Sequence, residues 1–136
     1  MNNLQGQKGE INMNILNLIS AARVFAQIGQ TKISSKLAYK IMRFCKSVAA
    51  DEEFYNNKRN EIINEYAVRD ENGAIVQSDD GVVNIMQDKI PEANAALMEL
   101  NGVEVEAPNI KFALSELEEL KLSVADMFAL DAFIEE

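Results

Sequence analysis

One apolar seam runs through residues 34–68 and constrains the fold more than any other feature. Its central members lie seven residues apart, at Ile41, Val48, Tyr55 and Ile62, and its flanking members are Leu37, Cys45 and Tyr66. This spacing predicts one continuous helix from about Ser34 to Val68, roughly 50 Å long. An amphipathic helix of that length must bury its seam against other elements.

A shorter helical pattern precedes this one. Apolar residues recur there at steps of three and four, at Ile11, Ile15, Leu18, Ile19, Ala22, Phe25 and Ala26. Gly29 follows the pattern and suits a helix C-terminus. The first helix can lie antiparallel over only half of the longer one, so the second half needs the C-terminal segment or another subunit. We therefore expect a homo-oligomer.

Turn and strand signals follow the long helix. The cluster 69–73 ends in Asn72-Gly73, which supplies the positive φ of a chain reversal. The β-prone runs 74–77 and 82–85, joined by 78–81, predict a β-hairpin.

The remainder predicts short elements. Pro91 suits the first turn of a helix that continues over 93–100, and the alternation in 103–106 predicts a half-solvated strand. Ser115 and Ser123 each precede an acidic residue by three positions, which is typical of helix N-caps. The last helix is expected to end near Phe133.

Together these patterns predict a mainly α fold with a small β element. The expected order is a long antiparallel helical hairpin, a β-hairpin and short C-terminal helices. We expect residues 1–10 to be a flexible lead-in and residues 11–136 to form one domain, with the helical hairpin in 11–69 and the mixed segment in 70–136.

The charges of the chain are divided by position. Residues 1–50 hold seven basic groups and one acid, whereas residues 51–136 hold six basic groups and twenty-one acids. The basic part must face something anionic, either the acidic part of its own assembly or a ligand. The net charge of −9 disfavours binding of a long nucleic acid.

Several kinds of chemistry lack the residues that they need. The chain has no histidine and a single cysteine, Cys45, which excludes the usual Ser-His and Cys-His nucleophile pairs and most zinc sites. No Gly-rich phosphate-binding motif occurs, and Asp70-Glu71-Asn72-Gly73 departs from a calcium loop. We expect a protein that is not an enzyme and that uses no metal or cofactor. The lack of a signal peptide or a long apolar run predicts no association with a membrane.

The candidate ligand-binding residues lie on one face of the long helix. At about 100° per residue, Lys36, Lys40, Arg43 and Lys46 fall within an arc of about 120°, and Tyr39 and Phe54 fall on it or beside it. Cations can bind phosphate and aromatic rings can stack on a base, so this face predicts a small anionic, ring-bearing ligand such as a cyclic nucleotide. The alternative is structural: carboxylates such as Glu116 to Glu119, from the same chain or a neighbouring subunit, cover the lysines as a rim of ion pairs.

Several segments also resemble a family of short proteins, of unknown function, encoded by tailed phages of Gram-positive hosts. They are residues 32–41, 54–59, 65–73, 100–105 and 122–126, taken in their order and spacing. The resemblance implies a phage origin and a place in the host bacterial cytoplasm. It implies no activity and no catalytic residue.

Two functions agree with these observations. The first is an oligomeric sponge that binds and sequesters a nucleotide-type signal of host antiviral defence. The second is an accessory factor for virion or tail assembly that binds another phage protein.

Overall fold

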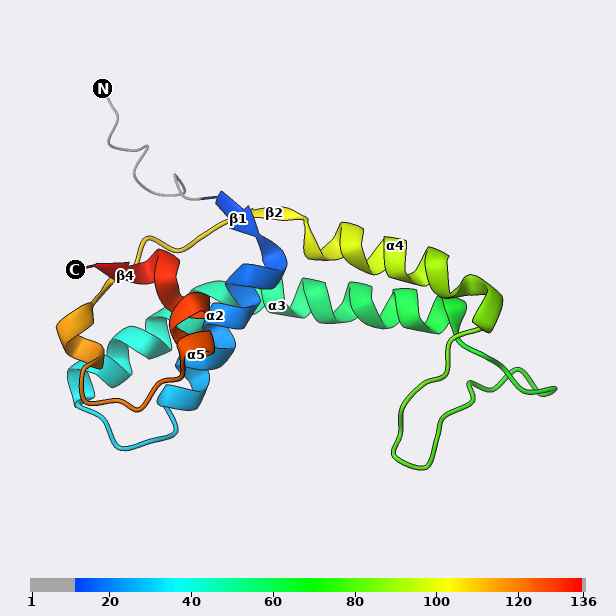
Figure 1. The fold of residues 1–136 in the computed structure, drawn as a ribbon, viewed down its shortest axis with the longest axis horizontal. Helices are drawn as coiled ribbons and strands as arrows, with labels where there is room; N and C mark the ends of the chain where they lie inside the picture. The colour runs from blue at the N-terminus through cyan, green and yellow to red at the C-terminus, as the bar shows by residue number, and fades with distance from the viewer. Residues whose placement is uncertain (1–11, 136) are drawn as a thin grey trace, which may run out of the picture. The chain divides into compact units, whose positions relative to one another are not determined.

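The computed structural model describes residues 12–135, which form a mainly helical fold with two very small sheets (Figure 1). The predicted fold class is confirmed at that level. The α-helices are α2 (Ile15–Ile28), α3 (Ser35–Tyr66), α4 (Ile90–Asn101) and α5 (Val124–Leu130). The strands are β1 (Asn12–Asn14), β2 (Glu104–Glu106), β3 (Phe112–Ala113) and β4 (Ile134–Glu135), and the 3-10 turns are η1 (Gln87–Lys89), η2 (Leu114–Leu117) and η3 (Asp131–Phe133).

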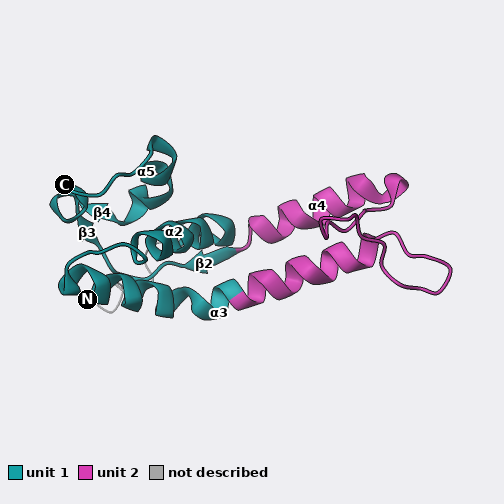
Figure 2. Ribbon diagram, turned by 90° about the horizontal axis from the view of Figure 1, so that it is seen from below, with its two compact units in different colours: residues 1–52, 104–136 teal, residues 53–103 magenta. Residues whose placement is uncertain are grey.

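The chain divides into two compact units (Figure 2). Among the described residues, unit 1 comprises 12–52 and 104–135, and unit 2 comprises 53–103. Helix α3 contributes to both units. The C-terminal segment belongs to unit 1, together with the first half of α3.

Four phenylalanines form the centre of unit 1. The ring of Phe25, on α2, lies 4.7 Å from that of Phe44 and 4.3 Å from that of Phe112 between ring centroids. Phe133 meets Phe44 edge-on at 4.7 Å. All four are fully buried, so α2, α3 and the C-terminal segment share one core.

The start of the first helix differs from the prediction. Residues 12–14 form β1, which pairs antiparallel with β2, with Met13 opposite Val105. The Asn14 side chain then accepts a hydrogen bond from Asn17 N at 2.8 Å and caps α2. This cap starts the helix at Ile15, and the strand pairing satisfies the backbone just before it. Ile11 and the predicted lead-in lie outside the described residues.

The long helix agrees closely with its predicted range. Ser34 accepts a hydrogen bond from Leu37 N at 3.1 Å at its start, and α3 ends at Tyr66, two residues before the predicted end. The seam residues of its first half, Leu37, Ile41 and Val48, are buried.

The second half of α3 is covered by α4 within unit 2. Tyr55 is only 6% exposed, and its hydroxyl donates to Asn101 Oδ1, on α4, at 2.7 Å. Ala93 and Leu100, also on α4, are buried. The central seam residue Tyr55 therefore needs no second subunit to cover it, and oligomerisation stays a prediction.

The loop 67–86 reverses twice. Isolated bridges join Arg69 to Ile75 and Gln77 to Val83, so the predicted hairpin segment pairs through single bridges and forms no regular strands. Gly73, at φ 84°, makes the predicted reversal, and Asp70 Oδ1 accepts hydrogen bonds from Asn72 N and Ala74 N there.

The two predicted serine caps have different outcomes. Ser123 accepts a hydrogen bond from Asp126 N at 3.0 Å, and Asp126 accepts one from Ser123 N, so the cap of α5 is confirmed. Ser115 caps nothing, because it lies inside η2. Helix α5 ends at Leu130, and η3 and β4 follow it. Across the described part of the chain, every helix is too short or too polar to cross a lipid bilayer.

Candidate anion-binding site

Three of the six predicted ligand-binding residues line one hollow in unit 1. This cationic hollow has a volume of about 350 Å³, and Tyr39, Met42, Arg43, Lys46, Ser47 and Ile110 line it. The first five lie within three turns of α3, and Ile110 comes from the segment between β2 and β3. The hollow is therefore completed by a residue far away in the sequence.

The cationic hollow is positively charged. Its lining contains two cationic side chains, Arg43 and Lys46, and no carboxylate. Within residues 12–135, neither cation lies within 4.0 Å of a carboxylate oxygen. The Tyr39 side chain is 61% exposed and can offer a ring face to a bound molecule. Met42 and Ile110 add apolar surface beside it.

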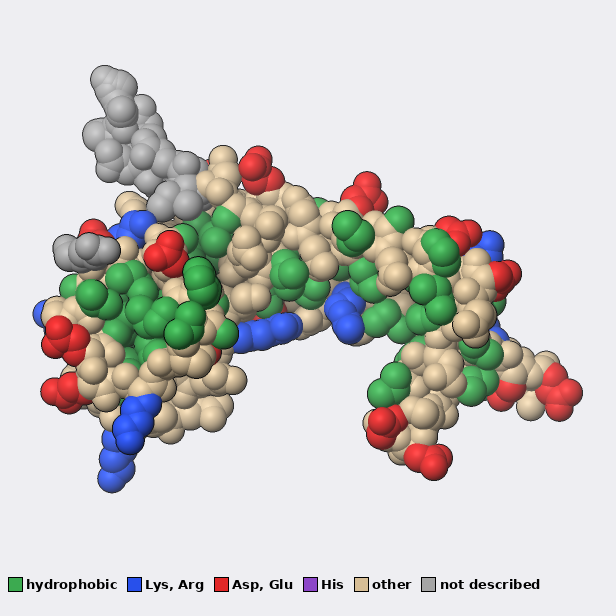
Figure 3. Space-filling view, in the orientation of Figure 1, with side chains coloured by type: hydrophobic (Ala, Val, Ile, Leu, Met, Phe, Trp, Pro, Cys, Tyr) green, Lys and Arg blue, Asp and Glu red, His purple; other side chains and the backbone are tan. Residues whose placement is uncertain are grey.

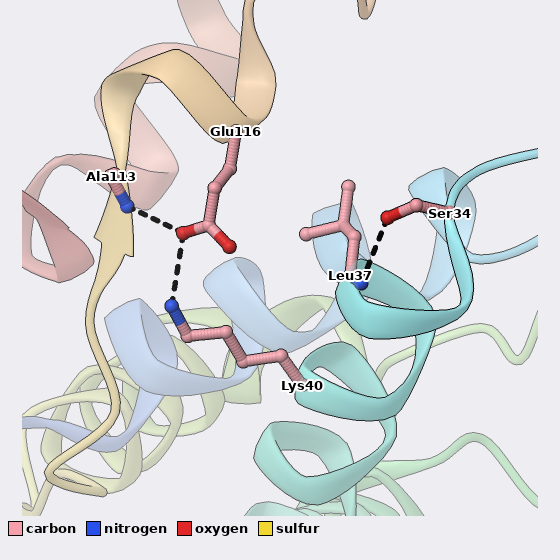
Figure 4. A network of polar contacts seen from close by, with 5 residues as sticks. All are labelled: Ser34, Leu37, Lys40, Ala113 and Glu116. Atoms are coloured by element: carbon pink, nitrogen blue, oxygen red, sulfur yellow. Dashed lines mark hydrogen bonds and ion pairs between the residues drawn. The ribbon is translucent and has the colours of Figure 1, made fainter.

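Lys40 is already bound by a carboxylate of its own chain (Figure 4). Its Nζ atom donates to Glu116 Oε1 at 2.9 Å, and the same oxygen accepts from Ala113 N at 2.7 Å. Lys40 Nζ also lies 4.9 Å from the centroid of the buried Phe112 ring. Lys40 is therefore covered by a carboxylate of its own chain, as the structural alternative predicts. It is partly buried and joins α3 to the β3–η2 segment.

The same contact changes the acidity of the carboxyl group. The hydrogen bond from Lys40 is the main cause that lowers the pKa of Glu116, the Ala113 N–H lowers it further, and burial opposes them. The positive charge of Lys36 lowers this pKa as well. Glu116 is thus held ionised and partly neutralises the N-terminal end of the basic face.

The two other predicted site residues do not join the cationic hollow. Lys36 is exposed one turn before Lys40 and does not line it. Phe54 is exposed on the part of α3 that belongs to unit 2.

Three lining residues were missed by the sequence analysis. Met42 and Ser47 lie three and four residues from Tyr39 and Arg43, so helical spacing alone could have identified them. The Ser47 hydroxyl donates to Phe44 O at 2.7 Å, which leaves its oxygen lone pairs as acceptors. Ile110 has no such signal, because only the tertiary fold brings it to α3.

Cys45 lies beside this face and is half-buried. Its sulfur lies 3.8 Å from Ala22 O, on α2. Burial raises the pKa of the thiol, and the negative charge of Glu52 raises it further. A thiol with a raised pKa is a weak nucleophile, which agrees with the place of Cys45 in the apolar seam, where it packs against the core of unit 1.

The side chains of the cationic hollow are suited to bind an anion. Its polar groups are a guanidinium, an ammonium, a phenol and a hydroxyl that already donates. Among residues 12–135, no three His, Cys, Asp or Glu side chains are grouped closely enough to hold a metal ion.

Comparison with protein-family models, with curated proteins and with solved structures gives no significant match for this chain.

Proposed function

We propose that this protein binds a small anionic molecule of the nucleotide type in the cationic hollow and retains it without turnover. The observation that carries the proposal is the pair Arg43 and Lys46, which share a hollow with an exposed tyrosine and no carboxylate. Arginine and lysine bind phosphate through charge-assisted hydrogen bonds, and a tyrosine ring stacks on a base.

The proposed phosphate site lies further along α3 than Lys40, at Arg43 and Lys46. Lys40 contributes by holding Glu116, and not by direct contact with the ligand, because its ammonium group is already paired. Arg43 and Lys46 lie one and two turns further along the helix. A hollow of about 350 Å³ lies near the lower end of the range for small-molecule sites, roughly 300–1,000 Å³, which favours one ring and its phosphate groups in each hollow.

We further propose that the protein acts as a sponge, which binds and sequesters its ligand. A phage protein in the host cytoplasm would sequester a nucleotide signal of antiviral defence, with its helices in an antiparallel hairpin. Oligomerisation would let two hollows hold the two halves of a cyclic dinucleotide. The support for this extension is the resemblance to phage proteins and the basic, aromatic-bearing face.

Calorimetric titration tests the proposal. Cyclic dinucleotides and the cyclic ADP-ribose isomers are titrated into the wild type, Lys46→Glu and Lys121→Glu. Lys121→Glu is the matched control, because it makes the same charge change on unit 1 away from the cationic hollow. We expect saturable binding of at least one nucleotide by the wild type and the control, and a loss of about tenfold or more in Lys46→Glu. No heat with any of these nucleotides would refute the proposal.

One observation favours the second candidate, an assembly factor that binds another phage protein. Val124 and Phe128 lie one turn apart on α5 and are 73% and 79% exposed. Hydrophobic side chains also gather on the face of unit 1 that carries α5 (Figure 3). Contiguous exposed apolar surface is typical of protein-binding sites.

A pull-down from infected cells separates the two candidates. An assembly factor is expected to retain portal, tail or scaffold proteins, and Phe128→Asp is expected to release them. A sponge is expected to retain none of these proteins, and its nucleotide binding would not change in Phe128→Asp.

A further inference from the structure

A second hollow, with a volume of about 510 Å³, lies entirely within unit 2. The second half of α3, the loop 67–86 and α4 form this aliphatic hollow. Its volume is well inside the range for small-molecule sites, roughly 300–1,000 Å³. None of the residues predicted to bind the nucleotide lines it.

The walls of the aliphatic hollow come mainly from branched aliphatic side chains, and the amides of Asn60, Asn64 and Asn94 also line it. Ile62 and Ile63 supply the aliphatic side chains from α3, Val83 and Ile85 from the loop, and Leu97 from α4. The lining contains no aromatic ring, so it offers no surface on which a base could stack. Its surface suits a flexible hydrocarbon chain, which gains free energy in proportion to the apolar area removed from water.

The one charged side chain of the lining is cationic, so it favours a ligand whose polar head group is an anion. Unit 2 carries ten acidic and four basic side chains, yet no carboxylate lines the hollow and one guanidinium, that of Arg59, does. The other three basic side chains have partners: Lys58 pairs with Glu61, Lys89 pairs with Glu92, and Arg69 donates to two backbone carbonyl oxygens.

Arg59 differs from these three. In the described part of the chain, it lies within 4.0 Å of no carboxylate. An arginine beside a mainly aliphatic hollow, in a unit with excess negative charge, is placed to bind a planar anion through two parallel hydrogen bonds.

We propose that the aliphatic hollow is a second binding site, for an aliphatic carboxylate. The hydrocarbon chain lies against Ile62, Ile63 and Leu97, and the carboxylate binds Arg59. Both parts of this ligand match the lining: the chain matches the branched side chains, and the head matches the one charge among them. This site is separate in residues and in ligand class from the proposed nucleotide site.

Decanoate, kept below its micelle concentration, is the probe that tests the proposal by calorimetry. We expect saturable binding to the wild type, roughly fourfold weaker for each methylene group removed in nonanoate and octanoate. Decyltrimethylammonium, which has the same chain and the opposite charge, is expected not to bind. Equal binding of the two amphiphiles, or no saturable heat with decanoate, would overturn the proposal.

Two pairs of variants locate the site. Arg59→Gln is expected to weaken decanoate binding about tenfold, whereas the neighbouring Lys58→Gln, which does not line the hollow, is expected to leave it unchanged. Val82→Asp places a carboxylate in the lining at a side chain that is 56% exposed, so the fold is expected to tolerate it.

Val124→Asp is the control for that second variant, because Val124 is exposed on unit 1. Circular dichroism checks that all four variants are folded. We expect Val82→Asp to abolish decanoate binding and Val124→Asp to preserve it. Unchanged affinity in both Arg59→Gln and Val82→Asp would contradict the assignment.

Discussion

Lys40 Nζ donates to Glu116 Oε1 at 2.9 Å, a hydrogen bond between residues 76 positions apart. The bond connects the first half of α3 to η2, and the same carboxylate oxygen accepts the Ala113 N–H. Two donors therefore meet on one partly buried oxygen. This contact fixes the C-terminal segment against the helix that carries the cationic hollow.

The first prediction concerns the pH dependence of this contact. The pKa of Glu116 is lowered from its ordinary value of 4.5, mainly by the Lys40 hydrogen bond. A lowered folded-state pKa stabilises the fold above the unfolded-state pKa, and the stabilisation is lost as the pH falls through the folded-state pKa. We expect Glu116→Gln to lower the free energy of unfolding by about 1 kcal/mol at neutral pH.

Urea unfolding at neutral pH and at a series of pH values that decreases from 4.5 through the lowered folded-state pKa of Glu116 measures this effect. The difference between wild type and Glu116→Gln is expected to disappear at low pH, where both side chains are uncharged. Glu118→Gln is the matched control, since Glu118 is exposed and forms no ion pair in residues 12–135. A pH-independent difference would show that charge is not the cause.

The second prediction concerns the aromatic core of unit 1. Phe44 is fully buried and contacts the rings of Phe25 and Phe133. Phe44→Ala removes these contacts and leaves a cavity, so we expect it to lower the free energy of unfolding by about 3–5 kcal/mol. Phe54→Ala makes the same chemical change at an exposed ring on the same helix. We expect it to cost less than about 1 kcal/mol, and equal losses would contradict the core described above.

The third prediction concerns the packing of α4 on α3 in unit 2. The Tyr55 hydroxyl donates to Asn101 Oδ1 at 2.7 Å. Tyr55→Phe removes the donor and keeps the ring, so we expect a loss of about 1 kcal/mol. A double-mutant cycle with Asn101→Ala isolates the pair, because a real contact gives a double variant that is more stable than the sum of the single effects implies. Strict additivity of the two single effects would show that they do not interact.

The fourth prediction concerns the reversal after α3. Gly73 has φ 84°, a conformation that costs a non-glycine residue roughly 1 kcal/mol or more, so Gly73→Ala is expected to destabilise unit 2 by about that amount. Gly102 has φ −92°, and a Cβ atom there would come no closer than 3.5 Å to Met98 O. Gly102→Ala is therefore expected to cost less. Hydrogen exchange of the Ala74 N–H, which donates to Asp70, would report local opening of the turn.

Local sequence determined the elements whose stabilising contacts lie a few residues apart. The seven-residue seam predicted α3 to within two residues at its C-terminal end, Asn72-Gly73 predicted the reversal, and Ser123 with Asp126 predicted the start of α5. In each case the hydrogen bonds or the apolar period that define the element lie within one or two turns of it. Such contacts form in the same way whatever the rest of the chain does.

The tertiary structure alone decided what the distant segments do. Residues 12–14 form a strand because they pair with β2, which lies about ninety residues later in the chain. Lys40 is not part of the proposed phosphate contact, because its ammonium group is bound to Glu116. Ile110 lines the cationic hollow together with Arg43 and Lys46. The helical period shows which side chains share a face. It does not show which distant group will pack against that face, because that choice depends on the free energy of the whole folded chain.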